Sequence, residues 1–318
     1  MKKIMIVGGA GYVGSKLVPV LLERGYTITV VDLFWFGDNL PNGVYKHKMN
    51  SLELAEFGND LKRYDQVIFL GGLSSDPMAE YSPSLNFVYN GAAPAHLAYI
   101  SKRAGIKRFI YAGSCSVYGY SQDKLYNEES PVVSNYPYGI SKLQGENAVL
   151  GLQDESFSTI SLRQGTISGY SPRMRLDLII NTMFKTAMQD CKIKVNNPSI
   201  WRPIISIKDI VTAYIRAIEC DESISGIFNV AFNNYTVGAI ADLIKDSLGK
   251  KITLEIDNIE DFRNYKVNIE KAKNILGFEP QNNVSDIVDD LLDNYDKFKD
   301  FDNDNYYNIK VFKKILKI

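Results

Sequence analysis

The sequence predicts an α/β protein: a doubly wound parallel sheet of the Rossmann type, followed by a smaller α/β domain. Over the first two-thirds of the chain, short and nearly continuous apolar runs alternate with longer helical patterns. Such runs are expected of strands whose two faces are both covered by helices. A glycine-rich turn also joins the first apolar run to the first helical pattern, and sheets of this kind bind nucleotides at that turn.

The elements of the sheet follow in order along the chain. Its strands are expected at residues 4–7, 27–32, 66–70 and 108–112. Helical patterns at 12–25 and 84–105 separate them, and both end in a basic residue followed by glycine, a helix-stop signal. Pro94 lies inside the second pattern, where it predicts a kink or an interruption.

After about residue 165 the alternation of apolar strands and helical stretches becomes less regular. Short strands are expected at 192–195, 202–207 and 252–256. Residues 171–189 are expected to form an arginine-rich loop followed by a helix, and further helices are expected at 236–249 and 284–298. We predict a nucleotide-binding domain over 1–165, with a returning segment near 201–231, and a second domain over 166–318. The tail at 301–318 has a basic and apolar end, which favours a packed C-terminal helix over a membrane-surface segment.

The composition excludes several classes of function. The 318 residues include 36 Lys and Arg against 37 Asp and Glu, a net charge of −1, so no global field attracts nucleic acid or an anionic membrane. Cys115, Cys191 and Cys220 are widely spaced, which predicts free thiols in a reducing cytoplasm and no metal cluster. No apolar run reaches the ~20 residues that span a bilayer. The lysine-led N-terminus continues as strand, turn and helix, so we interpret it as structure and not as a signal peptide.

The motif GGAGYVG predicts a dinucleotide site. Gly8, Gly11 and Gly14 lie between a strand and a helix, where glycine allows a tight turn and the close approach of a pyrophosphate to the helix N-terminus. Asp32 ends the next strand, where a carboxylate accepts hydrogen bonds from a ribose 2′-hydroxyl and repels a 2′-phosphate. The residues at 33–36 include no arginine or lysine, which favours NAD over NADP.

A second motif, YGISK, predicts a catalytic base. Tyr138 and Lys142 are four residues apart, so on a helix they share one face. A tyrosine is a poor base at its ordinary pKa of about 10, and a neighbouring ammonium group lowers that pKa by stabilising the phenolate. The cluster AGSCSVYG at 112–119 ends the preceding strand and supplies a hydroxyl donor.

These motifs occur in family order, and over nearly its whole length the chain resembles the extended short-chain dehydrogenase/reductase family, the NAD-dependent nucleotide-sugar epimerases and dehydratases. The matching stretches are GGAGYVG, Asp32, FLGG at 69–72, Asn90, SCSVYG, YGISK, LRQGTISG at 162–169, WRPIISIKD at 201–209 and GIFNV at 226–230. The resemblance implies that Tyr138 accepts the proton, that Lys142 binds the nicotinamide ribose, and that Ser114 hydrogen-bonds the reacting sugar hydroxyl.

The resemblance also implies an NAD site. Its expected residues are Gly8, Gly11, Tyr12, Val13, Gly14, Asp32, Leu33, Asn50, Ser51, Leu70, Gly71, Gly72 and Asn90, together with Tyr138 and Lys142. Asn50 stands where the family usually has an aspartate, which weakens the contact to the adenine amine.

The cluster Ser114–Cys115–Ser116 argues against dehydration. Family members that remove water resemble one another in having Thr-Asp-Glu there, because the reaction needs an acid and a base. C3/C5-epimerising members have a cysteine one residue later than Cys115, so we interpret this thiol as a small, half-buried structural group. What remains is hydride transfer at the sugar C4, giving a 4-epimerase or a 4-dehydrogenase. The alternatives left open are a 4,6-dehydratase and a non-catalytic dinucleotide sensor.

The second domain is expected to bind a nucleotide-diphosphate sugar, since arginine forks match diphosphate. The expected residues are Ser74, Ser114, Thr166, Arg173, Arg175, Arg202 and Arg263. The stretches SPRMR, SSDPM and RNY look most like a bacterial branch that makes capsule and O-antigen sugars and includes GDP-manno-heptose 4-dehydrogenases. The family resemblance further implies a homodimer through helices near 84–105 and 138–151.

Overall fold

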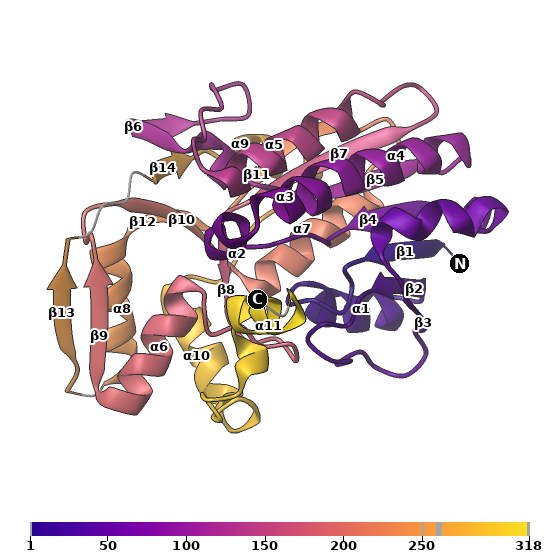
Figure 1. The fold of residues 1–318 in the computed structure, drawn as a ribbon. Helices are drawn as coiled ribbons and strands as arrows, with labels where there is room; N and C mark the ends of the chain where they lie inside the picture. Colours follow the sequence, from indigo (N-terminus) through magenta and orange to yellow (C-terminus); the bar gives the residue numbers. More distant parts are fainter. Residues whose placement is uncertain (1, 250, 259–262, 317–318) are drawn as a thin grey trace.

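A seven-stranded, fully parallel sheet forms the centre of the molecule (Figure 1). The computed structural model describes residues 2–249, 251–258 and 263–316, without the side chains of 54–59 and 121–123. From one edge to the other, the sheet contains β11 (Gly226–Val230), β7 (Ser158–Gln164), β5 (Arg108–Ser114), β4 (Gln66–Phe69), β1 (Lys3–Val7), β2 (Thr27–Asp32) and β3 (Tyr45–Lys48). The strand order reverses beside β1, which is where such sheets place their ligands. The predicted Rossmann-type fold is confirmed.

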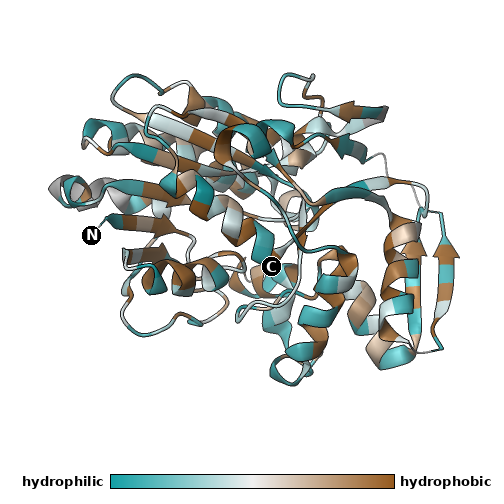
Figure 2. Ribbon diagram, turned by 180° about the vertical axis from the view of Figure 1, so that it is seen from behind, coloured by the Kyte–Doolittle hydropathy of each residue, from teal (hydrophilic) through white to brown (hydrophobic). Residues whose placement is uncertain are grey.

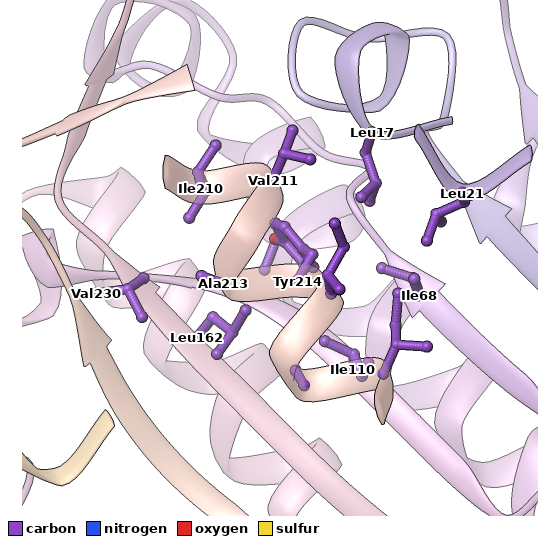
Figure 3. Packing of buried hydrophobic residues seen from close by; sticks show 14 of the residues in the cluster. Leu17, Leu21, Ile68, Ile110, Leu162, Ile210, Val211, Ala213, Tyr214 and Val230 are labelled. Atoms are coloured by element: carbon purple, nitrogen blue, oxygen red, sulfur yellow. The ribbon is translucent and has the colours of Figure 1, made fainter. Parts of the chain in front are cut away.

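The core lies on both faces of this sheet. In β1, Ile4 and Ile6 belong to one buried cluster, whereas Met5 and Val7 belong to another on the opposite face, as the two-residue period of a strand requires. The first face is covered by α1 (Gly14–Glu23), α7 (Ile207–Glu219) and α9 (Glu270–Leu276), and Figure 3 shows the side chains of α7 packed onto the strands. The second is covered by α4 (Ala93–Arg103), α5 (Pro137–Leu150) and the 3₁₀ segment Ser51–Arg63.

The single helix expected at 84–105 is interrupted. The chain forms α3 (Pro83–Phe87), then a π-helical turn over Val88–Ala92, then α4. Pro94 occupies the first turn of α4, where its missing N–H leaves no hydrogen bond unmade. The predicted interruption is confirmed, but it lies in the turn that precedes the proline.

The rest of the chain builds a second, smaller cluster of elements. Its strands are β8 (Thr166–Ser168), β10 (Trp201–Ser206) and β12 (Asn233–Thr236) in one sheet, β9 (Lys192–Asn196) with β13 (Thr253–Asp257), and β6 (Tyr120–Tyr126) with β14 (Asn264–Val267). Its helices α6 (Ile179–Asp190), α8 (Val237–Leu248) and α10 (Val284–Asp293) enclose a separate apolar core. Figure 2 shows hydrophobic residues along the strands of the central sheet. In the described parts of the chain, we find no helix with the length and apolar character that a membrane span requires.

The C-terminal tail returns to the first part of the molecule. Helix α11 (Asn308–Leu316) lies beside α2 (Asp76–Tyr81), as Figure 1 shows near the label C. Phe312 is fully buried there, with its ring 5.9 Å from that of Trp35 and 6.1 Å from that of Tyr81. The predicted packed C-terminal helix is confirmed, and it packs across the two parts of the chain.

Arg108 is expected to be a large contributor to stability. Its guanidinium is completely buried and donates to the carbonyl oxygens of Ala217 (3.0 Å) and Cys220 (2.8 Å) at the end of α7. Arg108→Met leaves these acceptors without their charged donor, so we expect the free energy of unfolding to fall by about 3 kcal/mol. Urea unfolding measures this loss. The exposed Arg103 is the matched control, because Arg103→Met is expected to change stability by less than about 0.5 kcal/mol.

Candidate active site

A cavity of about 700 Å³ opens at the carboxyl ends of the central strands. Of the residues predicted to bind cofactor or substrate, every one except Asn50 lines it. The structure therefore brings together loops that are far apart in the chain, from the glycine-rich turn to Arg263.

The glycine-rich turn fits a dinucleotide. Gly8 has a φ of +79°, and a Cβ at this position would collide with the backbone of Gly71 in the loop after β4. A Cβ on Gly14 would collide with the backbone of Gly9. Only glycine allows this close packing, which leaves backbone at the start of α1 free to face a pyrophosphate.

Asp32 is fixed at the end of β2. Its two carboxylate oxygens accept hydrogen bonds from the backbone N–H groups of Ala10 (2.9 Å) and Phe34 (2.8 Å). Burial raises the pKa of this carboxyl, while the backbone hydrogen bonds lower it. The glycine-rich turn and a carboxylate anchored to it form the donor and acceptor set that NAD requires.

Three predicted cofactor residues have side chains that already form hydrogen bonds within the protein. The Tyr12 hydroxyl donates to the carbonyl of Gly169 at 2.6 Å, which leaves its backbone for a ligand. Asn90 is buried and donates to the carbonyl of Leu73. Asn50 lies outside the lining: its side chain accepts from the Leu52 N–H and donates to the Tyr89 hydroxyl. The geometry thus gives the expected adenine contact of Asn50 no support.

Tyr138 and Ser114 form the polar centre of the cavity. Tyr138 lies in the first turn of α5, and Ser114 ends β5. The two side chains share a hydrogen bond, and Ser114 also accepts from the Ser116 hydroxyl at 2.8 Å. Burial raises the pKa of Tyr138 to about 12, helped by the negative charge of Asp76 and opposed by the bond to Ser114 and the charge of Arg175.

Lys142 does not lower the pKa of Tyr138 as the sequence predicts. Burial lowers the pKa of Lys142 itself to about 7, against the raising effect of Glu146. Its ammonium group lies over the Tyr111 ring, 4.4 Å from the centroid. The lysine is therefore only partly charged at neutral pH, and the raised pKa of Tyr138 reflects its burial and Asp76.

Cys115 faces away from the cavity. Its thiol is fully buried, where the sequence analysis expected half-burial, and it donates to the carbonyl of Arg163 at 3.1 Å. Burial raises its pKa far above the ordinary value, so the thiolate is strongly disfavoured. The interpretation of this residue as a structural thiol agrees with its position.

The arginines of the cavity already hold partners. Arg175 forms a two-pronged ion pair with Asp177 (2.8 and 3.1 Å) and reaches Ser74 at 3.3 Å. Arg263 pairs with Asp76 at 2.6 Å. Arg202 donates to the backbone carbonyl of Arg263, which ties β10 to the segment before β14.

Three lining residues that now matter were not named as site residues from the sequence, although two of them, Asp76 and Asp177, lie in or next to the stretches SSDPM and SPRMR. Asp76, Asp177 and Asn308 all face the cavity. Burial alone raises the pKa of Asp177, but the charge and hydrogen bonds of Arg175 hold it below the ordinary value. The spacing of RMRLD could have indicated the pair with Arg175, whereas Asn308 comes from the C-terminal helix and carried no motif.

Comparisons with known proteins agree with this architecture. A model described as the NAD dependent epimerase/dehydratase family matches residues 4–231. A UDP-glucose 4-epimerase of Oryza sativa subsp. japonica is 26% identical over 330 residues, covering 90% of this chain and 88% of that protein. A UDP-glucuronic acid decarboxylase of Arabidopsis thaliana is 25% identical over 293 residues, covering 88% and 66%. A solved UDP-glucuronic acid 4-epimerase of Bacillus cereus, bound to UDP-glucuronic acid and NAD, has a TM-score of 0.81 at 21% identity, covering 93% and 99%.

Proposed function

Because the chain belongs to the NAD dependent epimerase/dehydratase family, it is an NAD-dependent enzyme of nucleotide sugars, and we propose that it oxidises the C4 hydroxyl of a nucleotide-diphosphate sugar. The observation that carries the proposal is the pairing of Tyr138 with Ser114 on the wall of the cavity that also holds the glycine-rich turn. A base and a hydroxyl donor at one point suit the removal of an alcohol proton.

Ser114, Tyr138 and Lys142 have separate roles in the proposed oxidation. Ser114 hydrogen-bonds the reacting hydroxyl and orients it toward Tyr138, whose phenolate oxygen accepts the proton. Lys142 follows one turn later on the same face of α5 and binds the nicotinamide ribose. Bound NAD⁺ supplies the hydride acceptor, and its positive ring favours the phenolate that burial and Asp76 disfavour here.

Dehydration fits the cavity less well. At the positions where water-removing members carry two acids, this chain has Cys115, which faces away, and Ser116, which donates to Ser114. The nearby carboxylates Asp76 and Asp177 are each ion-paired with an arginine. Although burial raises the pKa of Asp177, the charge and hydrogen bonds of Arg175 outweigh burial and hold this pKa below its ordinary value, which makes this carboxylate a poor proton donor to a leaving hydroxyl.

The test begins with the nucleotides that the purified protein carries. They are identified after denaturation, and the protein is then offered UDP-, GDP- and dTDP-sugars while NADH is followed. A stoichiometric NADH burst without an epimer indicates a 4-dehydrogenase, and an epimer without accumulated NADH indicates a 4-epimerase. A product lighter by one water would instead establish a 4,6-dehydratase, and the absence of turnover with every sugar would favour a dinucleotide sensor.

We further propose a bacterial surface-polysaccharide role with a GDP-linked heptose as the preferred substrate. The stretches SPRMR, SSDPM and RNY favour it, and Arg175 and Arg263 from two of these stretches line the cavity. The curated relatives named above act on UDP-sugars by their names. Competition between UDP- and GDP-sugars for one site would show whether the chain prefers uracil or guanine as the nucleobase of its substrate.

The predicted homodimer is also a proposal. The exposed Tyr99 of α4 (48% exposed) lies within one of the two segments expected to form the interface. Light scattering of the purified chain is expected to give twice the monomer mass of 35.8 kDa. A monomer mass at micromolar concentration would contradict this expectation.

A further inference from the structure

Arg173 occupies an unusual position in the cavity wall. Only 3% of the residue is exposed, and its guanidinium carbon lies 3.6 Å from the centroid of the Phe36 ring. One of its terminal nitrogens donates to the side-chain oxygen of Asn308. Among the residues that the structure describes, its Nε has no hydrogen-bonding partner.

A buried cation with an unmade hydrogen bond is costly unless a ligand completes it. Burial and the neighbouring charge of Arg175 together lower the pKa of Arg173 to about 9, against smaller opposing effects of Asp177 and Asp32. Arg173 lines the cavity, and an anion beside its guanidinium would relieve the crowding of two positive charges. The geometry around Arg173 is therefore that of an anion subsite.

The surroundings of Arg173 belong to the dinucleotide half of the cavity. Phe36 follows β2 closely, and the charge of Arg173 is near enough to lower the pKa of Asp32. Two residues earlier, the Ser171 hydroxyl donates to the carbonyl of Tyr12 in the glycine-rich turn at 2.7 Å. Arg175, by contrast, turns toward Ser74 and Asp177.

We propose that Arg173 binds the diphosphate of the dinucleotide cofactor, and that Asn308 of the C-terminal helix is the positioning residue that aims it. Arg173 was expected to contact the substrate diphosphate, and this inference reassigns it to the other ligand of the cavity. The diphosphate is the charged group of NAD nearest to the ribose that Asp32 is expected to hold. The inference rests on the NAD site of the proposed function but not on the reaction at C4.

Helix α11 can perform this positioning because the face that carries Asn308 and Phe312, four residues apart, is anchored to the first part of the molecule. The Asn308 amide donates to Ser74 at 2.9 Å while its oxygen accepts from Arg173. One turn later, Phe312 is buried against Trp35 and Tyr81, and the backbone N–H of Leu176 donates to the carbonyl of Tyr306 just before the helix. The C-terminal segment thus contributes Asn308 to the wall of the cavity and holds the arginine in place.

The experiment measures binding and not turnover. Isothermal titration gives the Kd of NAD⁺, ADP-ribose, UDP and GDP for the full chain freed of bound nucleotide. Arg173→Met is expected to weaken both NAD⁺ and ADP-ribose by about ten- to a hundredfold, and R173K, which keeps the charge, is expected to recover part of the loss. For whichever of UDP and GDP binds the wild type, the Kd is expected to change by less than about threefold in R173M. Arg202→Gln is the matched control: it is expected to weaken the binding of the nucleoside diphosphate and to leave the binding of NAD⁺ and ADP-ribose nearly unchanged.

Asn308→Leu tests the positioning role independently of the folding of R173M, because it keeps Arg173 and the packing of Phe312. Like R173M, it is expected to weaken the binding of ADP-ribose, here with a Kd about three- to tenfold higher than that of the wild type. The double variant R173M/N308L is expected to be no weaker than R173M, since Asn308 acts through Arg173. Additive losses would mean that α11 has a separate structural role.

Three results would overturn the proposal. Loss of nucleoside diphosphate binding in R173M with unchanged ADP-ribose binding would make Arg173 a substrate ligand. A wild-type preference for NADP⁺ that R173M alone removes would mean that the guanidinium binds a 2′-phosphate beside Asp32. Unchanged binding of all four ligands would remove any ligand role. Failure to turn over any sugar nucleotide would contradict the proposed reaction and leave these binding results as they stand.

Discussion

Tyr138→Phe is expected to lower kcat by about 10²–10⁴-fold, the usual contribution of a positioned general base. The substitution removes one oxygen and keeps the ring, so the cavity wall and the binding of nucleotide are expected to stay nearly unchanged. Tyr138 lines the cavity in hydrogen-bonding contact with Ser114, and the proton of the sugar hydroxyl has no equivalent acceptor at that point. The measurement is single-turnover formation of NADH.

The pH profile distinguishes loss of the base from general damage. A tyrosine acts as a base only when deprotonated, so the oxidation rate of the wild type is expected to rise with pH through the pKa of Tyr138. In the ligand-free protein burial raises that pKa to about 12, and a bound cation is expected to lower it. The rising limb is expected to be absent in Y138F and present in Y45F, a control at an exposed tyrosine of β3. Full turnover of Y138F would refute the assigned role.

Arg163→Met is expected to destabilise the protein by about 3–5 kcal/mol, because it leaves a buried carboxylate without its partner. Arg163 on β7 and Glu146 on α5 have side chains exposed by only 3% and 1%, and their closest atoms are 2.6 Å apart. Arg163 also donates to the Tyr118 hydroxyl at 2.8 Å, while Ser161 donates to Glu146 at 2.7 Å. Denaturant unfolding, with the slope compared between variants, measures the loss.

The double variant Glu146→Met with Arg163→Met is the control for this prediction. Removing both charges together leaves no unpaired ion, so most of the lost stability is expected to return. The charge of Glu146 also raises the pKa of Lys142, which burial lowers to about 7, so without it Lys142 is less charged at neutral pH. The double variant is therefore expected to be stable but slower at pH 7 than the wild type. A single variant that loses less than about 1 kcal/mol would contradict the account.

Within the central sheet, the strands that the sequence predicted are those whose residues are mostly apolar. β1, β2, β4 and β5 consist of nearly uninterrupted apolar residues over most of their length. β3 is exposed along its whole length and has no apolar pattern to read. β7 is deeply buried, yet it includes serines, a threonine and Arg163. Ser158, Ser161 and Arg163 are hydrogen-bonded to groups remote in the chain, such as Glu146, and no local pattern reveals those partners.

The same distinction applies to the cavity. Motifs with fixed spacing led to Gly8, Asp32, Ser114 and the pair on α5, and the structure places all of them on one cavity. The sequence did not indicate Asp76 and Asn308 individually as site residues, because their roles depend on contacts with Arg263 and Arg173 that form only in the folded chain. The expected effect of Lys142 on Tyr138 failed for a related reason: the sequence gives the spacing of the two groups but not the burial that lowers the pKa of the lysine.

We propose above all that this chain moves a hydride at C4 of a nucleotide sugar. The most direct test supplies a nucleotide sugar with deuterium at C4 and follows the label by mass spectrometry. We expect deuterium on the nicotinamide of released or bound NADH, or back at C4 in an epimer of unchanged mass. A product that has lost water and holds the deuterium at C6, or a nicotinamide that stays unlabelled while product forms, would contradict the proposal.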